Sequence, residues 1–152
     1  MKRVYFAHPM EGLQIPEESG QRAFEARKLL GDGFEVWVPE EHQGTVSEQQ
    51  EIDLKALSAS DIVLADSYKR GLHRNGKLVF GYGTAQEIGI IKGLNHERTK
   101  QVPIVQIIRQ RVEDSYHPFD VEGKSNHFEV TKNCNSLEEA CDFIGKNYEK
   151  KN

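Results

Sequence analysis

The feature that most constrains the fold is an apolar run, Ile62-Val63-Leu64-Ala65, in which no polar residue interrupts either face of a strand. A strand of this kind is buried on both faces, as in a parallel sheet that helices cover. Similar runs with β-branched or aromatic residues predict further strands. These strands are expected at 4–7, 34–38 and 102–108, with at most a short one near 127–130.

Helical periodicity between and after these strands predicts four amphipathic helices. Strands that alternate with helices in this way form βαβ units with right-handed crossovers and a parallel sheet. We therefore expect an α/β fold, a single flavodoxin-like three-layer domain over residues 1–152 with a four- to five-stranded, mainly parallel sheet. The predicted helices are 16–30, 47–60, 84–94 and 136–148, and the segment 67–82 is expected to be a loop.

Single residues predict the ends and the buried faces of some of these helices. Ser47 with Gln50, and Ser136 with Glu139, have the S/T-x-x-E/Q spacing of a capping box. The apolar residues expected to face the sheet are Ala23, Ala26, Leu29 and Leu30 in the first helix and Ile52, Ala56 and Ala59 in the second.

Composition and charge exclude several classes of function. The net charge of −4 gives no global field that would attract nucleic acid or an anionic membrane. No apolar run approaches the roughly 20 residues of a membrane span, and the apolar stretch at the N-terminus is too short for a signal peptide. We expect a cytoplasmic protein with no membrane or nucleic-acid partner, in which Cys134 and Cys141 are free thiols.

Cofactor and metal signatures are missing from the sequence. The residues after the first predicted strand do not form G-x-G-x-x-G, and no G-x-x-x-x-G-K-[ST] occurs. The six histidines are scattered without the spacing of metal ligands. We expect neither a cofactor nor a metal site.

Glu87 is the leading candidate for chemistry. In an open α/β sheet, ligands bind in the crevice beyond the carboxyl ends of the strands. The segment Gly83-Thr84-Ala85-Gln86-Glu87 leads into the third predicted helix and would place a carboxylate at that edge. Such a group is a candidate nucleophile or acid–base, although Thr84-x-x-Glu87 also has the spacing of a capping box. Both interpretations remain open from the residues alone.

Residues in and after the first predicted strand are candidates for contact with Glu87 or with a substrate. Tyr5 is either a core tyrosine or one whose hydroxyl orients Glu87. His8 and Pro9 follow at the ligand edge of the sheet, where His8 could contact substrate or be an ordinary loop histidine.

Three aspartates have different expectations. Asp53 neighbours the predicted sheet-facing stripe of its helix, and either belongs to the site or lies on a solvated face. Asp61, directly before the central strand, is expected to be structural. Asp66 ends that strand at the ligand edge.

A basic segment lies between Asp66 and Glu87. It contains Lys69, Arg70 and Arg74 and no acidic residue. In a net-acidic protein it is either a solvated loop or a lid that approaches an anionic group such as a nucleotide phosphate.

Taken together, these motifs resemble the nucleoside 2-deoxyribosyltransferase-like family over residues 3–107. The resemblance rests on Val4-Tyr5-Phe6-Ala7-His8-Pro9-Met10, on Asp53 followed by Ser60-Asp61-Ile62-Val63-Leu64-Ala65, and on Gly83-Thr84-Ala85-Gln86-Glu87-Ile88-Gly89. It implies a flavodoxin-like fold and cleavage of a nucleoside N-glycosidic bond, without a cofactor and often in a homo-oligomer.

The resemblance also implies roles for individual residues. Glu87 would attack the sugar C1′, Tyr5 would position it, and Asp53 would assist departure of the base by protonation. A covalent glycosyl–carboxylate would then pass to another base or to water. Substrate contacts are expected at His8, Pro9, Gly81, Gly83, Thr84 and Asp66, and phosphate contacts at Lys69, Arg70 and Arg74.

One position departs from the family pattern. Gly81 stands where transferases often carry an Asp that contacts the base. The base preference and the need for a phosphate therefore stay open, and a non-catalytic nucleotide-binding or sensing module of the same fold is the alternative.

Overall fold

The computed structural model describes residues 1–7, 16–39, 45–66, 68–72, 78–80, 82–107, 115–116 and 130–149. For 16–20, 46, 68–72, 78–80, 82–83, 85 and 115–116 the description covers the backbone alone. Among these residues, no helix combines the length and the apolar character that crossing a membrane requires.

A five-stranded parallel sheet forms the centre of the molecule. Its strand order is β2-β1-β3-β6-β8, so the strands taken in chain order are arranged 2-1-3-4-5. This is the flavodoxin-like order, whose ligand crevice lies at the carboxyl ends of the strands. The predicted fold class is confirmed. The strands are β1 (Lys2–Ala7), β2 (Phe34–Trp37), β3 (Ile62–Asp66), β6 (Ile104–Ile107) and β8 (Lys132–Cys134).

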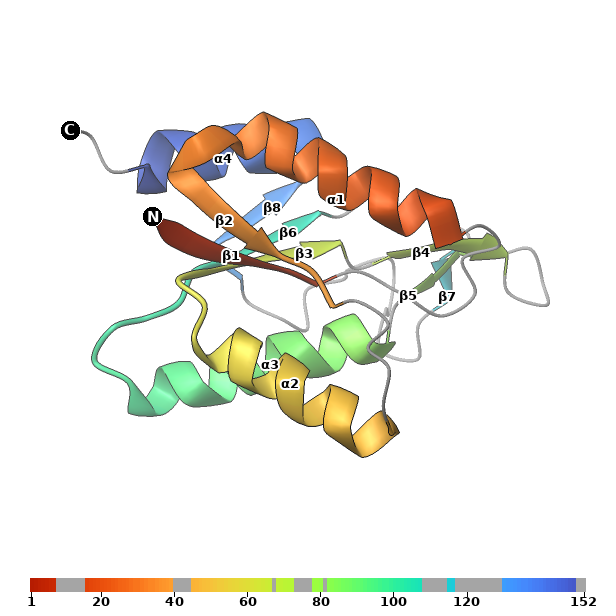
Figure 1. Cartoon of the computed structure of the whole chain (residues 1–152), viewed down its shortest axis with the longest axis horizontal. Helices are drawn as coiled ribbons and strands as arrows, with labels where there is room; N and C mark the ends of the chain where they lie inside the picture. The colour runs from red at the N-terminus through yellow and green to blue at the C-terminus, as the bar shows by residue number, and fades with distance from the viewer. Residues whose placement is uncertain are drawn as a thin grey trace.

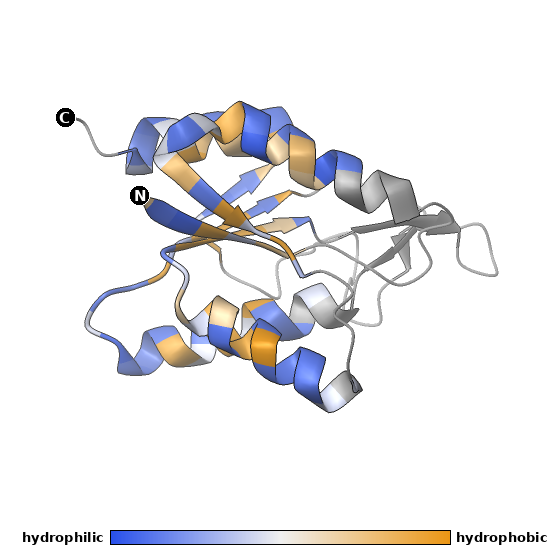
Figure 2. Ribbon diagram, viewed as in Figure 1, coloured by the Kyte–Doolittle hydropathy of each residue, from blue (hydrophilic) through white to orange (hydrophobic). Residues whose placement is uncertain are grey.

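Helices cover both faces of this sheet and complete the three layers (Figure 1). One face carries α1 (Pro16–Leu30) and α4 (Leu137–Tyr148), and the other carries α2 (Val46–Ser58) and α3 (Tyr82–Glu97). Hydrophobic and hydrophilic residues alternate along the helices, as Figure 2 shows. Since β3 has buried residues on both faces, it contributes to two separate hydrophobic clusters, one under each pair of helices.

Helix ends follow local signals, with one correction. Helix α1 has the predicted bounds and is followed by Gly31, whose φ of 68° suits glycine. Ser136 caps α4 as predicted, since its side chain accepts from the Glu139 amide. Helix α2, however, begins one residue before Ser47: Thr45 is its N-cap and accepts from the Glu48 amide at 3.2 Å.

The predicted buried faces were partly wrong. Ala23, Ala26 and Leu30 are buried, but Leu29 is 43% exposed because it lies about 100° around the helix from Leu30. In α2 the buried face is turned by one position toward Leu57, so Ile52 and Ala59 are exposed.

The segment 67–82 is not only a loop, contrary to the prediction. It contains β4 (Tyr68–Leu72) and β5 (Leu78–Phe80), which pair antiparallel, and β5 pairs in parallel with β7 (Ser115–Tyr116). Figure 1 shows this small second sheet on the side toward which the arrow of β3 points. The last strand of the central sheet also lies later than predicted, at β8; residues 127–129 are outside the described residues.

The two cysteines are buried free thiols, as predicted. Cys134 ends β8 and Cys141 lies in α4. Burial raises the pKa of the Cys141 thiol to about 12, so this thiol stays protonated and unreactive at neutral pH.

Candidate active site

Tyr5 lies on the sheet face that α2 and α3 cover. Strand alternation sends Val4 and Phe6 into the cluster under α1 and α4, and Tyr5 into the opposite cluster. The Tyr5 side chain is fully buried, and its ring stacks on Trp37 with centroids 5.3 Å apart and planes 20° apart. This stacking holds the ring in one orientation.

Glu87 lies in the second turn of α3, further into the helix than the sequence suggested. Because α3 begins at Tyr82, Thr84 is its third residue and Glu87 its sixth. In a capping box the threonine precedes the helix and the glutamate is its third residue. The capping interpretation of Glu87 is therefore wrong, and its carboxyl group must be accounted for in another way.

Asp53 lies near Tyr5 and Glu87 because the buried face of α2 is rotated relative to the predicted one. With Ala56 and Leu57 buried against the sheet, the residue one turn earlier also lies on the sheet side of the helix. Asp53 is half-buried, and its charge acts on both Tyr5 and Glu87. The structure thus brings together the three residues that the sequence singled out for chemistry, one each from β1, α2 and α3.

The pKa values of Tyr5 and Glu87 are perturbed by this arrangement. Burial raises the pKa of Glu87 from its ordinary 4.5 to about 7, with a hydrogen bond from Tyr5 opposing the rise and the charge of Asp53 adding to it. Burial and the neighbouring Glu87 raise the pKa of Tyr5 above its ordinary range. At neutral pH the tyrosine therefore keeps its proton, while the carboxyl group is about half ionised.

The polar atoms of this cluster are incompletely satisfied. Tyr5 Oη and Glu87 Oε2 are buried, and neither makes a hydrogen bond of standard geometry to a described residue. The electrostatic contact between the two groups is therefore looser than such a bond. Buried polar atoms without partners are costly and uncommon. A carboxyl group that titrates near neutrality beside a protonated tyrosine suits a nucleophile or an acid–base.

Asp66 lies on the other face of the sheet from Tyr5. Its side chain is 3% exposed and pairs with Arg22 of α1, with 2.6 Å between Oδ2 and Nη2. The pair ties α1 to the carboxyl end of β3. The sequence does not single out Arg22. The one available signal for its role is weak: it is a basic residue next to the buried stripe of α1.

The remaining predicted site residues are described in part or not at all. Thr84 is buried in the first turn of α3, and Gly83 lies in the same turn. Lys69 and Arg70 belong to β4, of which the backbone alone is described. His8, Pro9, Gly81 and Arg74 lie outside the described residues.

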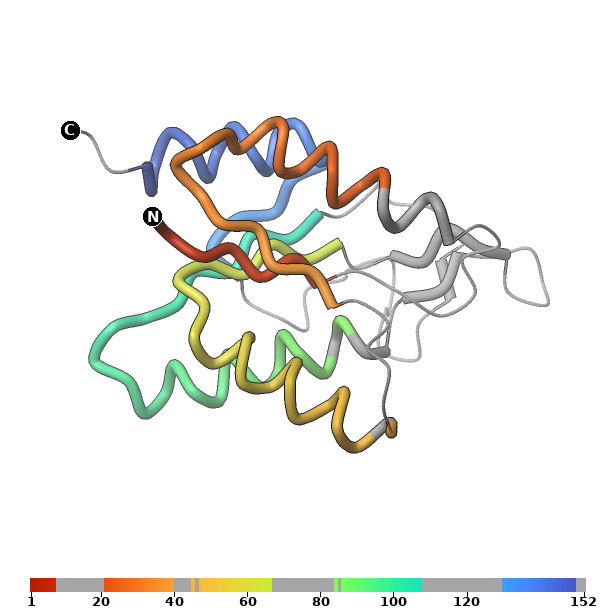
Figure 3. Tube along the Cα trace, viewed as in Figure 1, coloured from red at the N-terminus to blue at the C-terminus, as the bar shows by residue number. Residues whose placement is uncertain are grey.

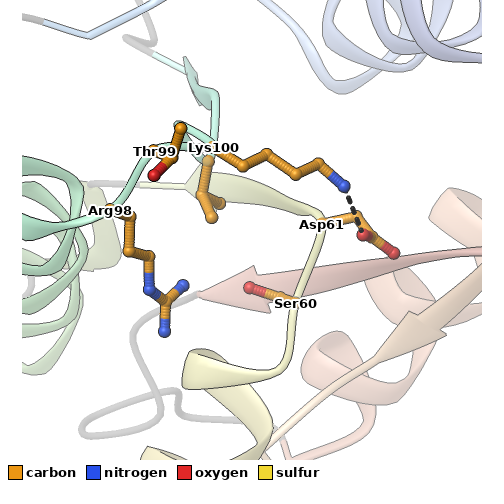
Figure 4. Close-up of a pocket in the computed structure, with 6 residues that line it drawn as sticks. Ser60, Asp61, Arg98, Thr99 and Lys100 are labelled. Atoms are coloured by element: carbon orange, nitrogen blue, oxygen red, sulfur yellow. Dashed lines mark hydrogen bonds and ion pairs between the residues drawn. The ribbon is translucent and has the colours of Figure 1, made fainter.

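A hollow of about 260 Å³ opens at the opposite edge of the sheet, near the start of β3 (Figure 4). Asp61 lies there, accepts the Arg3 amide at 2.9 Å and pairs with Lys100 at 3.5 Å. Arg98 is bound to the Ser58 carbonyl at 3.0 Å. These groups hold segments of the chain together, in keeping with the structural role expected of Asp61.

Comparison with known proteins identifies the fold. No protein-family model and no curated protein matches the sequence. A conserved protein from Enterococcus faecalis V583 has a similar structure, with a TM-score of 0.64 and 16% identity over 96% of this chain and 98% of that one. A 2-deoxyribosyltransferase from Leishmania mexicana is similar with a TM-score of 0.63 and 20% identity over 97% and 99%. At these identities the likeness establishes a shared fold.

Proposed function

We propose that this chain cleaves the N-glycosidic bond of a nucleoside, deoxynucleoside or nucleoside monophosphate through a covalent glycosyl ester on Glu87. The sugar then passes to another base, in a transferase, or to water, in a hydrolase. The observation that carries this proposal is the meeting of Tyr5, Asp53 and Glu87, with a pKa of about 7 at Glu87. The shared fold with a 2-deoxyribosyltransferase supports it.

In the first step the ionised Glu87 carboxylate attacks the sugar C1′. The bond between a Glu87 oxygen and C1′ forms as the bond between C1′ and the base nitrogen breaks, through an oxocarbenium-like transition state. The electron pair of the broken bond stays with the base nitrogen, which takes a proton from Asp53; the step starts from the protonation state in which Asp53 carries a proton and Glu87 is ionised. The Tyr5 hydroxyl donates to Glu87 and holds it toward C1′.

In the second step an acceptor restores the enzyme. A nitrogen of another base, or a water oxygen, attacks C1′ from the face that the first base left. The ester bond breaks, its electron pair returns to Glu87 as a carboxylate, and the acceptor gives up its proton to Asp53. Two inversions at C1′ retain its configuration.

Glu87→Ala is the test, with Glu97→Ala as the matched control. Glu97 is an exposed residue at the end of the same helix. The purified variants are incubated with a panel of nucleosides and monophosphates, with and without a free acceptor base, and the bases are separated by chromatography. We expect Glu87→Ala to lose base release while keeping the melting temperature, and Glu97→Ala to match wild type.

Two further outcomes decide between chemistry and binding. A glycosyl ester on Glu87, detected by mass spectrometry after acid quenching, supports the covalent step directly. Base release that survives in Glu87→Ala refutes it. Saturable nucleotide binding with no released base supports the alternative, a non-catalytic binding or sensing module.

A further inference from the structure

Gln106 is a buried polar residue that the proposed chemistry leaves unused. Its side chain is 0% exposed, although the other residues of its strand, β6, are all apolar. Neither Nε2 nor Oε1 of its amide has a hydrogen-bond partner among the described residues. An amide that is buried without partners costs stability, so its presence in the core needs an explanation.

Gln106 lies on the same face of the sheet as Tyr5. The preceding residue on that face, Ile104, packs in the cluster that contains Tyr5 and Ala65, whereas Val105 and Ile107 pack in the other cluster. Alternation along β6 therefore directs Gln106 toward the α2 and α3 layer. Its neighbours in the sheet register are Ala65 on β3, whose side chain has no polar atom to offer, and Asn133 on β8, and neither hydrogen-bonds to the amide.

Gln106 also lies level with Glu87 along the sheet. The side chain of Asn95, near the end of α3, donates to the Val102 carbonyl at 2.9 Å and accepts its amide at 2.8 Å. Gln106 is four residues beyond Val102, about 13 Å if the chain is extended at 3.3 Å per residue. Helix α3 runs back along the strands from this point (Figure 3), and 13 Å at 1.5 Å per residue covers about nine of its residues. This distance leads from Asn95 to the turn that holds Glu87.

The same end of the sheet contains two more unpaired atoms on this face. Thr84 is buried one turn before Ile88, and its Oγ1 has no hydrogen-bond partner among the described residues. Glu87 Oε2, as described above, is in the same situation. Unpaired polar atoms from α3 and from β6 thus lie on the same face toward the same end of the sheet, which is the arrangement expected where a polar ligand supplies the missing partners.

We propose that Gln106 is a specificity-determining residue of the Glu87 site, whose amide hydrogen-bonds to a neutral donor–acceptor group of the bound nucleoside. This inference rests on the proposed function and adds what the site recognises. A carboxamide offers one acceptor and two donors and has no charge. It therefore pairs with a neutral group that both donates and accepts, and is poorly suited to a phosphate.

Two parts of a nucleoside have this chemistry. The edge of a base presents a donor and an acceptor side by side, as adenine does to an asparagine or glutamine amide. A sugar hydroxyl also donates and accepts. The two sources are separated with nucleosides that lack one group at a time: an unsubstituted purine nucleoside for the base, and 2′-deoxy or 3′-deoxy nucleosides for the sugar.

The test uses Gln106→Met, with Ile104→Met as its control on the same strand and face. Methionine matches the length of glutamine without polar atoms, and Ile104→Met changes only apolar packing. We expect Gln106→Met to melt at or above the wild-type temperature, since an unpaired amide is removed. We expect its KM and its calorimetric Kd for the preferred nucleoside to rise about 10-fold or more, which is the size of one or two lost hydrogen bonds. In Ile104→Met both constants should stay near wild type.

The analogues identify the contacted group. The penalty of Gln106→Met should disappear with the one nucleoside that lacks this group, because the two changes then remove the same interaction. A KM and Kd that stay at wild-type values for every nucleoside overturn the inference. So does an equal penalty for all analogues, or a wild-type chain that binds no nucleoside.

Failure of this inference is distinct from failure of the proposed function. If Glu87→Ala stops base release and Gln106→Met changes nothing, only the role of Gln106 is wrong. If no nucleoside is cleaved but Gln106→Met weakens binding of one, Gln106 recognises the ligand and the glycosidic chemistry is wrong.

Discussion

The pKa of Glu87 predicts that replacing this residue by glutamine, which fills the same volume, stabilises the protein at neutral and alkaline pH. Burial holds the pKa of Glu87 at about 7, against an ordinary value of 4.5. The folded state therefore disfavours the charged carboxylate relative to the unfolded chain. Glu87→Gln keeps the shape of the neutral acid and removes its titration.

The sign and size of the effect follow from proton linkage. Below pH 4.5 the group is protonated in both states, so the wild type has no penalty there. Between pH 4.5 and 7 the unfolded chain releases the proton and the folded chain keeps it, so the free energy of unfolding falls as the pH rises. Above pH 7 the loss is complete at about 3 kcal/mol, from a shift of about 2.5 units at 1.36 kcal/mol each.

Urea unfolding at pH 4.5 and pH 8.5 measures this difference. We expect Glu87→Gln to match wild type within about 1 kcal/mol at the lower pH and to exceed it by about 3 kcal/mol at the higher. Glu97→Gln, an exposed glutamate of the same helix, serves as the control and should show no pH-dependent gain. A Glu87→Gln variant whose advantage is the same at both pH values, or negative at pH 8.5, would refute the argument.

Two more predictions concern neighbouring residues. Tyr5→Phe removes a polar contact that lowers the pKa of Glu87, and Asp53→Asn removes a charge that raises it. The acidic limb of the pH profile of kcat/KM should therefore move up in the first variant and down in the second. Movement in the same direction would contradict this. Arg22→Met removes the ion pair with the buried Asp66 carboxylate and should cost about 3–5 kcal/mol in urea unfolding at pH 7, the usual effect of removing one member of a buried pair. A loss under 1 kcal/mol would show that the pair contributes little.

Much of the architecture could be predicted because its signals are local. The bounds of α1 follow from Pro16 and Gly31, and the cap of α4 from Ser136, since each acts within one helical turn. The small sheet of β4, β5 and β7 was missed. Its strands are short, and the paired residues of β5 and β7 are 37 positions apart (Leu78 with Ser115, Val79 with Tyr116). No local hydrophobic period therefore predicts this sheet.

The residues of the candidate site could be predicted from the sequence, but their geometry could not. Glu87 and Tyr5 were identified from the order of motifs, but the spacing with Thr84 suggested a cap that the true start of α3 excludes. Asp53 was placed beside a stripe that included Ile52, which is 42% exposed. Packing of α2 on the sheet, rather than the periodicity of its sequence, decided which face of the helix is buried.

By itself the sequence determined the alternation of strands and helices, and with it a parallel sheet covered on both faces. Hydrophobic periodicity and capping residues act over a few neighbouring positions, so they can be recognised in the sequence alone. Tertiary structure alone decided that Arg22 pairs with Asp66 and that Gln106 is buried. It also decided that Tyr5, Asp53 and Glu87 share one face, where burial raises the pKa of the carboxyl group. These properties depend on the distance between segments that are remote in the chain and on the water that their contact excludes.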